Sequence, residues 1–204
     1  MPSNHYSPRP CSVDACRNHT VTGAETCWEH IENKAAFLSG LDPAVLAGAW
    51  LAELDWSVLS QPRSLRGVDI SGARLSRAKL IGADLRGANL HRAFLDGTDL
   101  RGADLSGANL EMAVLGGADV SGAHFRGANL RRANLVGTRG HAADFTDADL
   151  YYARPGNADL QHADFTGARI ERTIFRRANL TGAILVNAAG TANFEHARLE
   201  GIRR

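Results

Sequence analysis

Apolar residues recur along most of this chain at a spacing of five. The pattern covers 25 consecutive five-residue units centred on residues 65 to 185, and the central residue is Leu, Ile, Val or Phe in 23 of them. Only Gly140 and Pro155 depart from it. A period of five fits neither an α-helix, at about 3.6 residues, nor a flat strand, at about two. The chain must therefore turn within every unit to bring each fifth side chain back into the interior.

The other positions of the unit agree with such a turn. Ala stands two residues before the centre in 20 of the 25 units, which suits a narrow interior filled by alternating small and large side chains. Gly stands two residues after the centre in 13 units, where a corner needs backbone angles that other residues resist. A short period of this kind predicts a solenoid, in which each unit buries its apolar face against the next one.

The run from Ala83 to Leu90, Ala-Asp-Leu-Arg-Gly-Ala-Asn-Leu, resembles the pentapeptide repeat proteins, whose unit is Ala-(Asp/Asn)-Leu-X-X. The resemblance extends over nearly the whole chain after position 60. It implies an all-β solenoid, a right-handed quadrilateral β-helix with four units in each coil. Four units to a coil place residues twenty apart in one column, so we expect Phe125, Phe145 and Phe165 to stack inside the rod.

The same arithmetic defines two candidate interaction sites on the outer surface. One is an acidic column on the face outside the phenylalanines, made of Asp84, Asp104, Asp144 and Asp164. The other is the adjacent pair Tyr151 and Tyr152, close in sequence to the two units that depart from the pattern. Those units are expected to leave a bulge or a thin core, and Pro155 also lacks a ladder donor. The tyrosines either form a contact site or cover the weakened core, and the second interpretation is preferred.

The chain before the repeats contains a candidate metal site. Residues 1–10 have the composition of a disordered lead-in, and residues 11–40 resemble a small zinc knuckle of the Cys3His type. Its ligands would be Cys11, Cys16, Cys27 and His30, spaced C-x4-C-x10-C-x2-H. Four ligands of this kind make a closed tetrahedral set, which indicates a structural rather than catalytic Zn(2+). His19 is an alternative fourth ligand, and free thiols beside a surface histidine are the alternative to a metal.

Two helices are predicted between the cysteines and the repeats. The first begins near Trp28 and runs to about Ser39. The second lies within residues 41–61, where Asp42 and Pro43 have the order of an N-cap and a first helical residue. Its apolar stripe contains Leu46, Trp50, Leu54 and Val58. We expect this second helix to cap the first coil of a β-helix in residues 62–204; a partner-binding role is the alternative.

Composition and charge limit the possible functions and locations of the protein. Residues 1–60 carry three basic and seven acidic side chains, a net charge of −4, while residues 61–204 carry 20 and 15, a net charge of +5. No apolar run is long enough to cross a membrane, and the first ten residues do not resemble a signal peptide, so a cytoplasmic location is expected. Three cysteines, all before residue 28, do not suit a disulfide framework.

No catalytic motif is present, so the protein is not expected to be an enzyme. The first hypothesis is a scaffold that binds a protein partner, whose identity the sequence does not specify. The second follows from the resemblance, since some family members mimic duplex DNA, bind type II DNA topoisomerases and protect them from inhibitors. The rod charge of +5 argues against a mimic of that kind, and only the aspartate column offers a partial acidic face.

Two further expectations complete the prediction. Nucleic-acid binding through the zinc segment is the third hypothesis, but that segment is acidic and aromatic residues are too sparse for base stacking. After Leu185 the spacing of five continues through Phe194 and Leu199, displaced by one residue. No helix is predicted after that coil, which leaves two outcomes for the end of the rod, end-to-end dimerisation into a homodimer or a short frayed tail.

Overall fold

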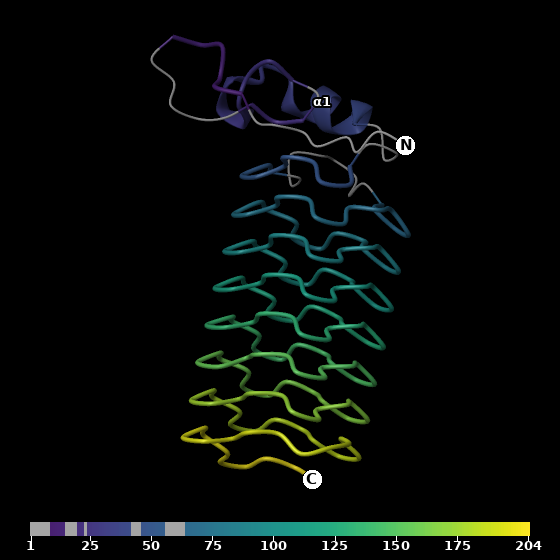
Figure 1. Ribbon diagram of the computed structural model, residues 1–204, viewed down its shortest axis with the longest axis vertical. Helices are drawn as coiled ribbons and strands as arrows, with labels where there is room; N and C mark the ends of the chain where they lie inside the picture. The colour runs from purple at the N-terminus through teal and green to yellow at the C-terminus, as the bar shows by residue number, and fades with distance from the viewer. Residues whose placement is uncertain (1–8, 15–19, 23, 42–45, 56–63) are drawn as a thin grey trace.

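The computed structural model describes residues 9–14, 20–22, 24–41, 46–55 and 64–204. The predicted disordered lead-in lies outside these ranges except for its last two residues, and so do both ends of the predicted second helix. The chain forms a tall stack of coils with a small N-terminal unit at one end and the C-terminus at the other (Figure 1). The arrangement is the one expected of a solenoid that starts beneath a separate cap.

Each coil contains four units, because parallel bridges join residues twenty apart, such as Asp84 with Asp104. The N–H of each central residue except Pro155 donates to the coil below, as Leu100 does to the Asp119 carbonyl at 2.7 Å. The turn that follows is closed by the Ala103 N–H, which donates to the Leu100 carbonyl at 3.0 Å. One bridge per unit leaves each side too short to count as a continuous strand, so the ladders of the described residues are isolated bridges.

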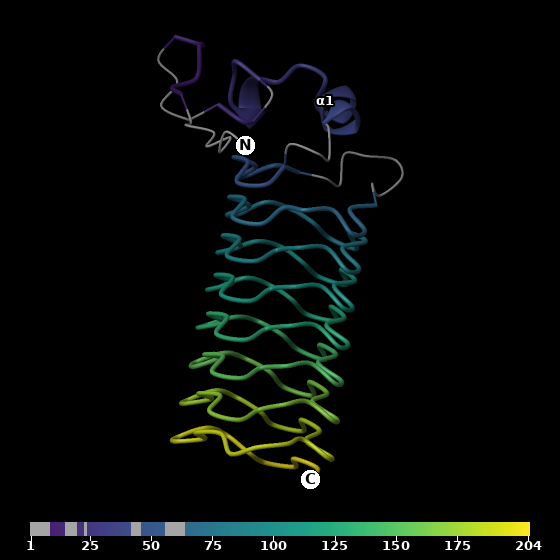
Figure 2. The same ribbon diagram turned by 45° about the vertical axis from the view of Figure 1, so that its right-hand side comes forward.

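The four sides of the rod are named here by the outward residue just before four successive centres. They are the Asp84 face, the Asn89 face, the Phe94 face and the Asp99 face. Successive coils add one outward residue to each face, so each face presents a column of side chains at a spacing of twenty. The coils rise almost straight in both views (Figures 1 and 2).

The interior is filled by the repeated apolar residues, and Leu100 has no exposed surface. The predicted phenylalanine stack is confirmed. The rings of Phe125 and Phe145 are stacked with centroids 4.8 Å apart, and those of Phe145 and Phe165 with centroids 4.9 Å apart. A second stack joins Phe175 to Phe194 at 5.2 Å. Side chains that recur once per coil therefore pack on copies of themselves.

Three buried threonines replace the usual alanine without leaving a polar group unpaired. The Thr98 hydroxyl donates to the Leu75 carbonyl at 2.8 Å. Thr138 and Thr173 make the same bond to the carbonyls of Leu115 and Leu150, at 3.0 and 2.7 Å. A buried hydroxyl costs little once it is hydrogen-bonded, so these units keep the geometry of their neighbours.

The two departures from the pattern do not interrupt the coil. The thin core expected at Gly140 is not found, because a Cβ built there would lie 2.9 Å from Leu160 Cδ2 and 3.2 Å from Val120 Cγ2. The side chains above and below have closed the space. Pro155 is buried in the regular position, and the turn after it has the same geometry as the others, so the expected bulge is absent there too.

The predicted second helix is wrong across the described residues 46–55. These residues form turns and bridges that continue the rod, with Trp50 paired to Arg74 and Asp55 to Lys79. Gly48 and Glu53 have φ values of 68° and 65°, which an α-helix does not accommodate. Both bridges span four positions more than those of the regular coils, so the register of this first coil is shifted relative to the coils below it.

The N-terminal unit contains a 3-10 helix, η1 (Trp28–His30), and an α-helix, α1 (Lys34–Gly40). The single helix predicted over this stretch is therefore divided, and Asn33 starts the second part by accepting a bond from the Ala36 N–H at 3.0 Å. Figures 1 and 2 show the unit lying over the first coil. Leu38 of α1 is fully buried in the same apolar cluster as the rod, so this unit performs the capping role assigned to the second helix.

Hydrogen bonds between Thr22 and Trp50 join the cap to the first coil. The Thr22 N–H donates to the Trp50 carbonyl at 2.9 Å, and the Trp50 N–H donates to the Thr22 hydroxyl at 2.7 Å. At the far end the bridges shorten by one position, beginning with Ile174 and Asn193, which confirms the predicted displacement by one residue. The apolar residues of that last coil, such as Phe194, are only partly buried.

Candidate metal centre and interaction surfaces

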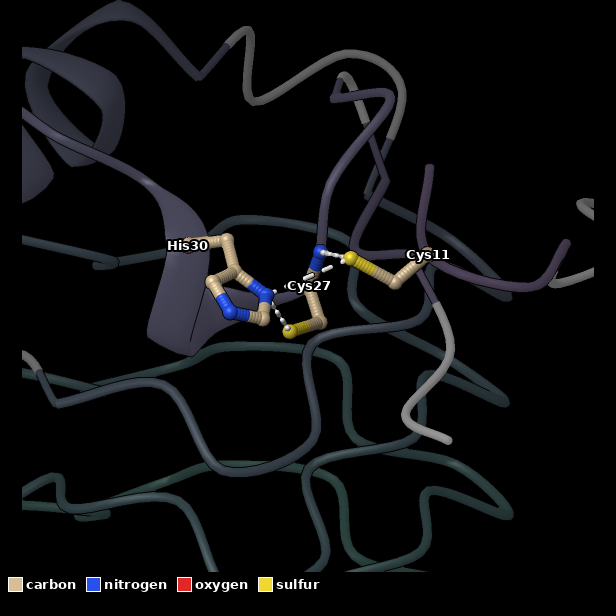
Figure 3. Close-up of side chains that lie close together, drawn as sticks. All are labelled: Cys11, Cys27 and His30. Carbon is tan, nitrogen blue, oxygen red and sulfur yellow. Dashed lines mark hydrogen bonds between the residues drawn. The ribbon is translucent and has the colours of Figure 1, made fainter. Parts of the chain in front are cut away.

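Cys11, Cys27 and His30 converge in the N-terminal unit (Figure 3). Cys27 is the N-cap of η1 and His30 is its last residue, so this single turn presents both side chains on one side. His30 Nδ1 lies 3.3 Å from the Cys27 sulfur and 3.4 Å from the Cys11 sulfur. All three ligand atoms lie within 4.8 Å of one another. The structure thus brings together three of the four residues predicted to bind a metal.

The environment of Cys11 favours a thiolate. Burial raises the pKa of this thiol, but hydrogen bonds from the backbone N–H groups of Cys27 and Val13 and from the side chains of His30 and Cys27 lower it more, to about 6. The Cys27 N–H lies 3.3 Å from the Cys11 sulfur. Both sulfurs are buried and neither is in a disulfide. Thiolate sulfur and neutral imidazole nitrogen are the ligands that Zn²⁺ prefers.

The two sulfur-to-nitrogen separations fit a tetrahedral zinc ion. Bonds of about 2.3 Å to sulfur and about 2.1 Å to nitrogen place a sulfur and a nitrogen ligand about 3.6 Å apart. The two separations from His30 Nδ1, 3.3 and 3.4 Å, need to widen only slightly. Cys16 and His19, the two residues proposed for the remaining position, lie outside the described residues. A fourth protein ligand would close the site, as in structural rather than catalytic zinc centres.

The predicted aspartate column is aligned on the Asp84 face. Bridges join Asp84 to Asp104 and Asp144 to Asp164, with His124 between the two pairs. Arg86 occupies part of this column, donating from Nε and Nη2 to the two carboxylate oxygens of Asp84 at 2.8 Å each. Hydrogen bonds from the Arg86 side chain hold the pKa of Asp84 well below its usual range, although burial opposes this. The column is therefore ordered but not uniformly acidic.

The tyrosine pair is surrounded by arginines. The rings of Tyr151 and Tyr152 meet edge to face with centroids 4.7 Å apart. The guanidinium carbons of Arg131 and Arg169 lie 4.8 and 4.3 Å from the Tyr151 ring centroid. Arg172 lies 5.1 Å from the Tyr152 ring and donates to its hydroxyl. The pair therefore belongs to a cationic part of the surface.

Sequence reasoning predicted that Pro155 lacks a ladder donor, but it did not identify the acceptor that is left without a partner. On this side of the full coils each central N–H donates to the carbonyl of an outward residue in the next coil, as Leu135 does to Arg154 at 3.1 Å. Pro155 has no N–H, so the Ile174 carbonyl loses that partner and the bridge between Arg154 and Ile174 is absent from the described ladder. The sequence contained the information needed to find this carbonyl, because Ile174 stands twenty residues, or one coil, after Arg154.

Among the described residues, no helix combines the length and apolar character needed to cross a membrane.

Comparisons with known proteins agree with the architecture. The family model described as pentapeptide repeats matches eight overlapping copies between residues 64 and 189, well over half of the chain. No curated protein sequence matches the chain. Among solved structures, it is similar to HetL, a pentapeptide repeat protein involved in heterocyst differentiation regulation in Nostoc sp. strain PCC 7120, at 26% identity over 75% of this chain and 89% of that one, with a TM-score of 0.33.

Two other solved structures are also similar. Full-length QnrB1, a plasmid-mediated fluoroquinolone resistance protein, is 19% identical over 80% of this chain and 87% of that chain, with a TM-score of 0.34. A pentapeptide repeat protein from the Arabidopsis thaliana thylakoid lumen is 31% identical over 53% of this chain and 66% of that chain, with a TM-score of 0.23.

Proposed function

The chain belongs to the pentapeptide repeat family, whose members fold as right-handed quadrilateral β-helices, and we propose that it is a non-enzymatic scaffold that binds a protein partner through the faces of its rod. The filled interior carries this proposal. Ala and larger apolar side chains, mostly Leu and from residue 125 onward also Phe, occupy the interior of every complete coil, and the polar and charged residues are displayed in outward columns. Recognition in such a molecule takes place on ordered, flat faces.

The scaffold proposal is tested by affinity capture with the full chain from a nuclease-treated native lysate. We expect a partner protein to be retained in stoichiometric amount and to be released by competition with free, untagged chain. Retention no greater than on bare resin would contradict the proposal, because a scaffold must bind at least one partner.

We also propose that Cys11, Cys27 and His30, with Cys16 or His19, hold a structural Zn²⁺ that orders the cap. The support is the convergence of two buried sulfurs and one ring nitrogen on a common point. Metal analysis of the dialysed protein should find about one zinc per chain. Less than half an equivalent would contradict the proposal. Glu32→Gln, an exposed change close to the site, should keep the metal that Cys27→Ser loses.

A second candidate function rests on the aligned aspartates of the Asp84 face. An ordered acidic column is the feature through which a rod of this shape would bind a DNA topoisomerase in place of DNA. The net charge of +5 over residues 61–204 argues against it. A supercoiling assay with a type II topoisomerase and a poison tests it directly. Protection that is lost in Asp104→Lys would support it, and no effect at saturating protein would exclude it.

A further inference from the structure

The Phe94 face differs from the other three in charge. Its outward column contains no carboxylate among the described residues, whereas the Asp84, Asn89 and Asp99 columns each contain at least two. In order along the rod it consists of Trp50, Arg74, Phe94, Val114, Asn134, Arg154, Ile174 and Asn193. A face that combines apolar and basic side chains and lacks acidic ones is complementary to an apolar and acidic partner.

Exposed apolar side chains lie on this face and at its two corners, around the unit that contains Pro155. Val136, Tyr152 and Ile174 are 38, 37 and 36% exposed, and they are three of only five large apolar residues with such exposure in the described structure. The coil register places Val136 in the coil above this unit and Ile174 in the coil below it. The Gly137 N–H donates to the Gly156 carbonyl at 3.0 Å, so Val136 lies directly above Gly156, which has no side chain to cover it.

Ile174 is the neighbour on the other side of this unit. Its N–H donates to the Ala153 carbonyl at 2.9 Å, which places it below Arg154. We name the group formed by Val136, Tyr152, Arg154 and Ile174 the Pro155 patch, after the residue at its centre. The patch also contains a backbone acceptor, because the Ile174 carbonyl has no hydrogen-bond donor in the described structure. That oxygen lies 3.9 Å from where a Cβ on Gly156 would stand.

Arginines without a carboxylate partner border the patch. Arg132, Arg154 and Arg177 are exposed and form no ion pair within the described residues. Two acidic side chains at the corners of the coils below are already engaged, since Glu171 pairs with Arg169 at 2.9 Å and Glu195 with Arg176 at 3.4 Å. Arg154 and Arg177, which flank Ile174 in the coil register, therefore present unpaired positive charge beside this apolar side chain.

We propose that the Pro155 patch is the docking site for an acidic protein segment that carries apolar side chains. Carboxylates of the partner pair with Arg132, Arg154 and Arg177, its apolar side chains cover Val136 and Ile174, and one of its N–H groups donates to the free Ile174 carbonyl. The inference deepens the scaffold proposal and rests on it, because it names the face and the chemistry of the partner.

The contacts of the tyrosines favour a protein over single-stranded nucleic acid. Base stacking requires an aromatic ring with an open face. The Tyr151 ring already contacts the guanidinium groups of Arg131 and Arg169, and the Tyr152 ring contacts Arg172 and the Tyr151 ring. Exposed valine and isoleucine side chains, in contrast, are covered well by aliphatic side chains of a partner.

The test is selection of a random-peptide display library on the immobilised full chain. We expect enrichment of peptides that combine Asp or Glu with Val, Ile or Leu. A synthetic peptide of an enriched sequence should then bind the Ile174→Asp and Arg154→Glu variants at least tenfold more weakly than the parent. Ile81→Asp is the matched control, because Ile81 is 43% exposed at a corner that does not border the Phe94 face. It should bind the peptide like the parent.

Several results would overturn the inference. Enriched peptides that are neutral or basic, or that bind the two patch variants like the parent, would place the docking surface elsewhere and leave the scaffold proposal intact. Tighter binding of an oligothymidine than of the enriched peptide would assign the patch to nucleic acid. No enrichment on the parent, together with no captured partner, would remove both proposals. Melting temperatures of the outward-facing variants within a few degrees of the parent confirm that the fold is retained.

Discussion

The rod of residues 64–204 and the N-terminal cap are stabilised in different ways. In the rod the same contacts recur in every coil, a buried centre, a turn bond and a ladder bond, such as those of Leu100. The cap depends on contacts that occur once, including the two hydrogen bonds between Thr22 and Trp50 and the cluster around His30. Stability in a repeat is close to a sum over units and their interfaces, whereas an irregular segment depends on each of its few contacts.

This contrast indicates where substitutions are tolerated. When one coil lacks a side chain, side chains of the coils above and below can fill the space, as Leu160 and Val120 do at Gly140. In the described part of the cap, by contrast, each ligand and each hydrogen bond occurs once, and no neighbouring unit repeats it. Predictions that separate the two regions therefore compare a change in the rod with a change in the cap, or one coil with another.

The largest effect is expected from Leu100→Arg. Leu100 has no exposed surface, so the variant places an unpaired charge in a dry interior at the middle of the stack. The cost is comparable to the whole stability of a domain, about 5–15 kcal/mol, and folding should be lost. Circular dichroism and thermal unfolding check this. Ser106→Arg puts the same side chain at an outward corner and should melt like the parent. A folded Leu100→Arg with the parent's melting temperature would refute the packed four-sided interior.

The next effect should be confined to the cap. Cys27→Ser removes one proposed zinc ligand and the contact with His30 Nδ1 at 3.3 Å. Hydrogen exchange in residues 24–41 should become at least tenfold faster, while the ladder amides of the rod keep their protection, because sub-global opening follows local contacts. Loss of protection throughout the rod would show that the two regions form one cooperative unit.

The rod was predictable from the sequence because its interactions are local and periodic. Spacing of five, Ala before each centre and Gly after it define the coil, and adding twenty to Phe125 and Phe145 predicts the ring stack that the structure contains. The first coil was not recognised, since residues 44–59 also have apolar residues at intervals of four. The order Gly48-Ala49-Trp50-Leu51 does match Gly87-Ala88-Asn89-Leu90, but only two units precede the change of register that separates this coil from the regular ones.

The sites were predictable only in part. Spacing alone predicted that Cys11, Cys27 and His30 lie together. Several cysteines and a histidine within a short segment are typical of residues that bind one metal ion. The Pro155 patch depends on residues from three different coils, from Val136 to Ile174, and on a carbonyl whose donor is missing. Such a group becomes visible only when the coil register is known, because the relevant partners are neighbours in the stack and not in the sequence.

A comparison within the phenylalanine stack should give an effect of intermediate size. Phe145 has stacked rings on both sides, at 4.8 and 4.9 Å, whereas Phe125 has one. Each ring pair contributes about 0.5–1.5 kcal/mol beyond the area it buries. We therefore expect Phe145→Leu to destabilise the rod by about 1 kcal/mol more than Phe125→Leu, measured by chemical denaturation. Equal losses would indicate that burial, and not stacking, accounts for the preference for phenylalanine in this column.

The smallest effect concerns the ion pair on the Asp84 face. The Arg86 side chain lowers the pKa of Asp84, so the folded state holds its proton less tightly than the unfolded state does. The resulting stability is complete above the unfolded pKa of about 4 and is lost as the pH falls toward the depressed folded value. Because the pair is partly exposed, its contribution should be at most about 1 kcal/mol. Asp84→Asn should cost that amount at neutral pH, and the difference from the parent should shrink in strong acid.

Asp144→Asn is the control for this measurement, since Asp144 faces His124 at 3.8 Å and has no arginine partner in the described structure. It should lower the free energy of unfolding less than Asp84→Asn at neutral pH, because no bidentate guanidinium contact is lost with it. If both variants lose the same stability, the bidentate arginine contributes nothing, and the aspartate column acts through turn hydrogen bonds such as that from the Thr146 N–H to Asp144 at 2.9 Å. The regular ladder, and not surface charge, would then account for the stability of this face.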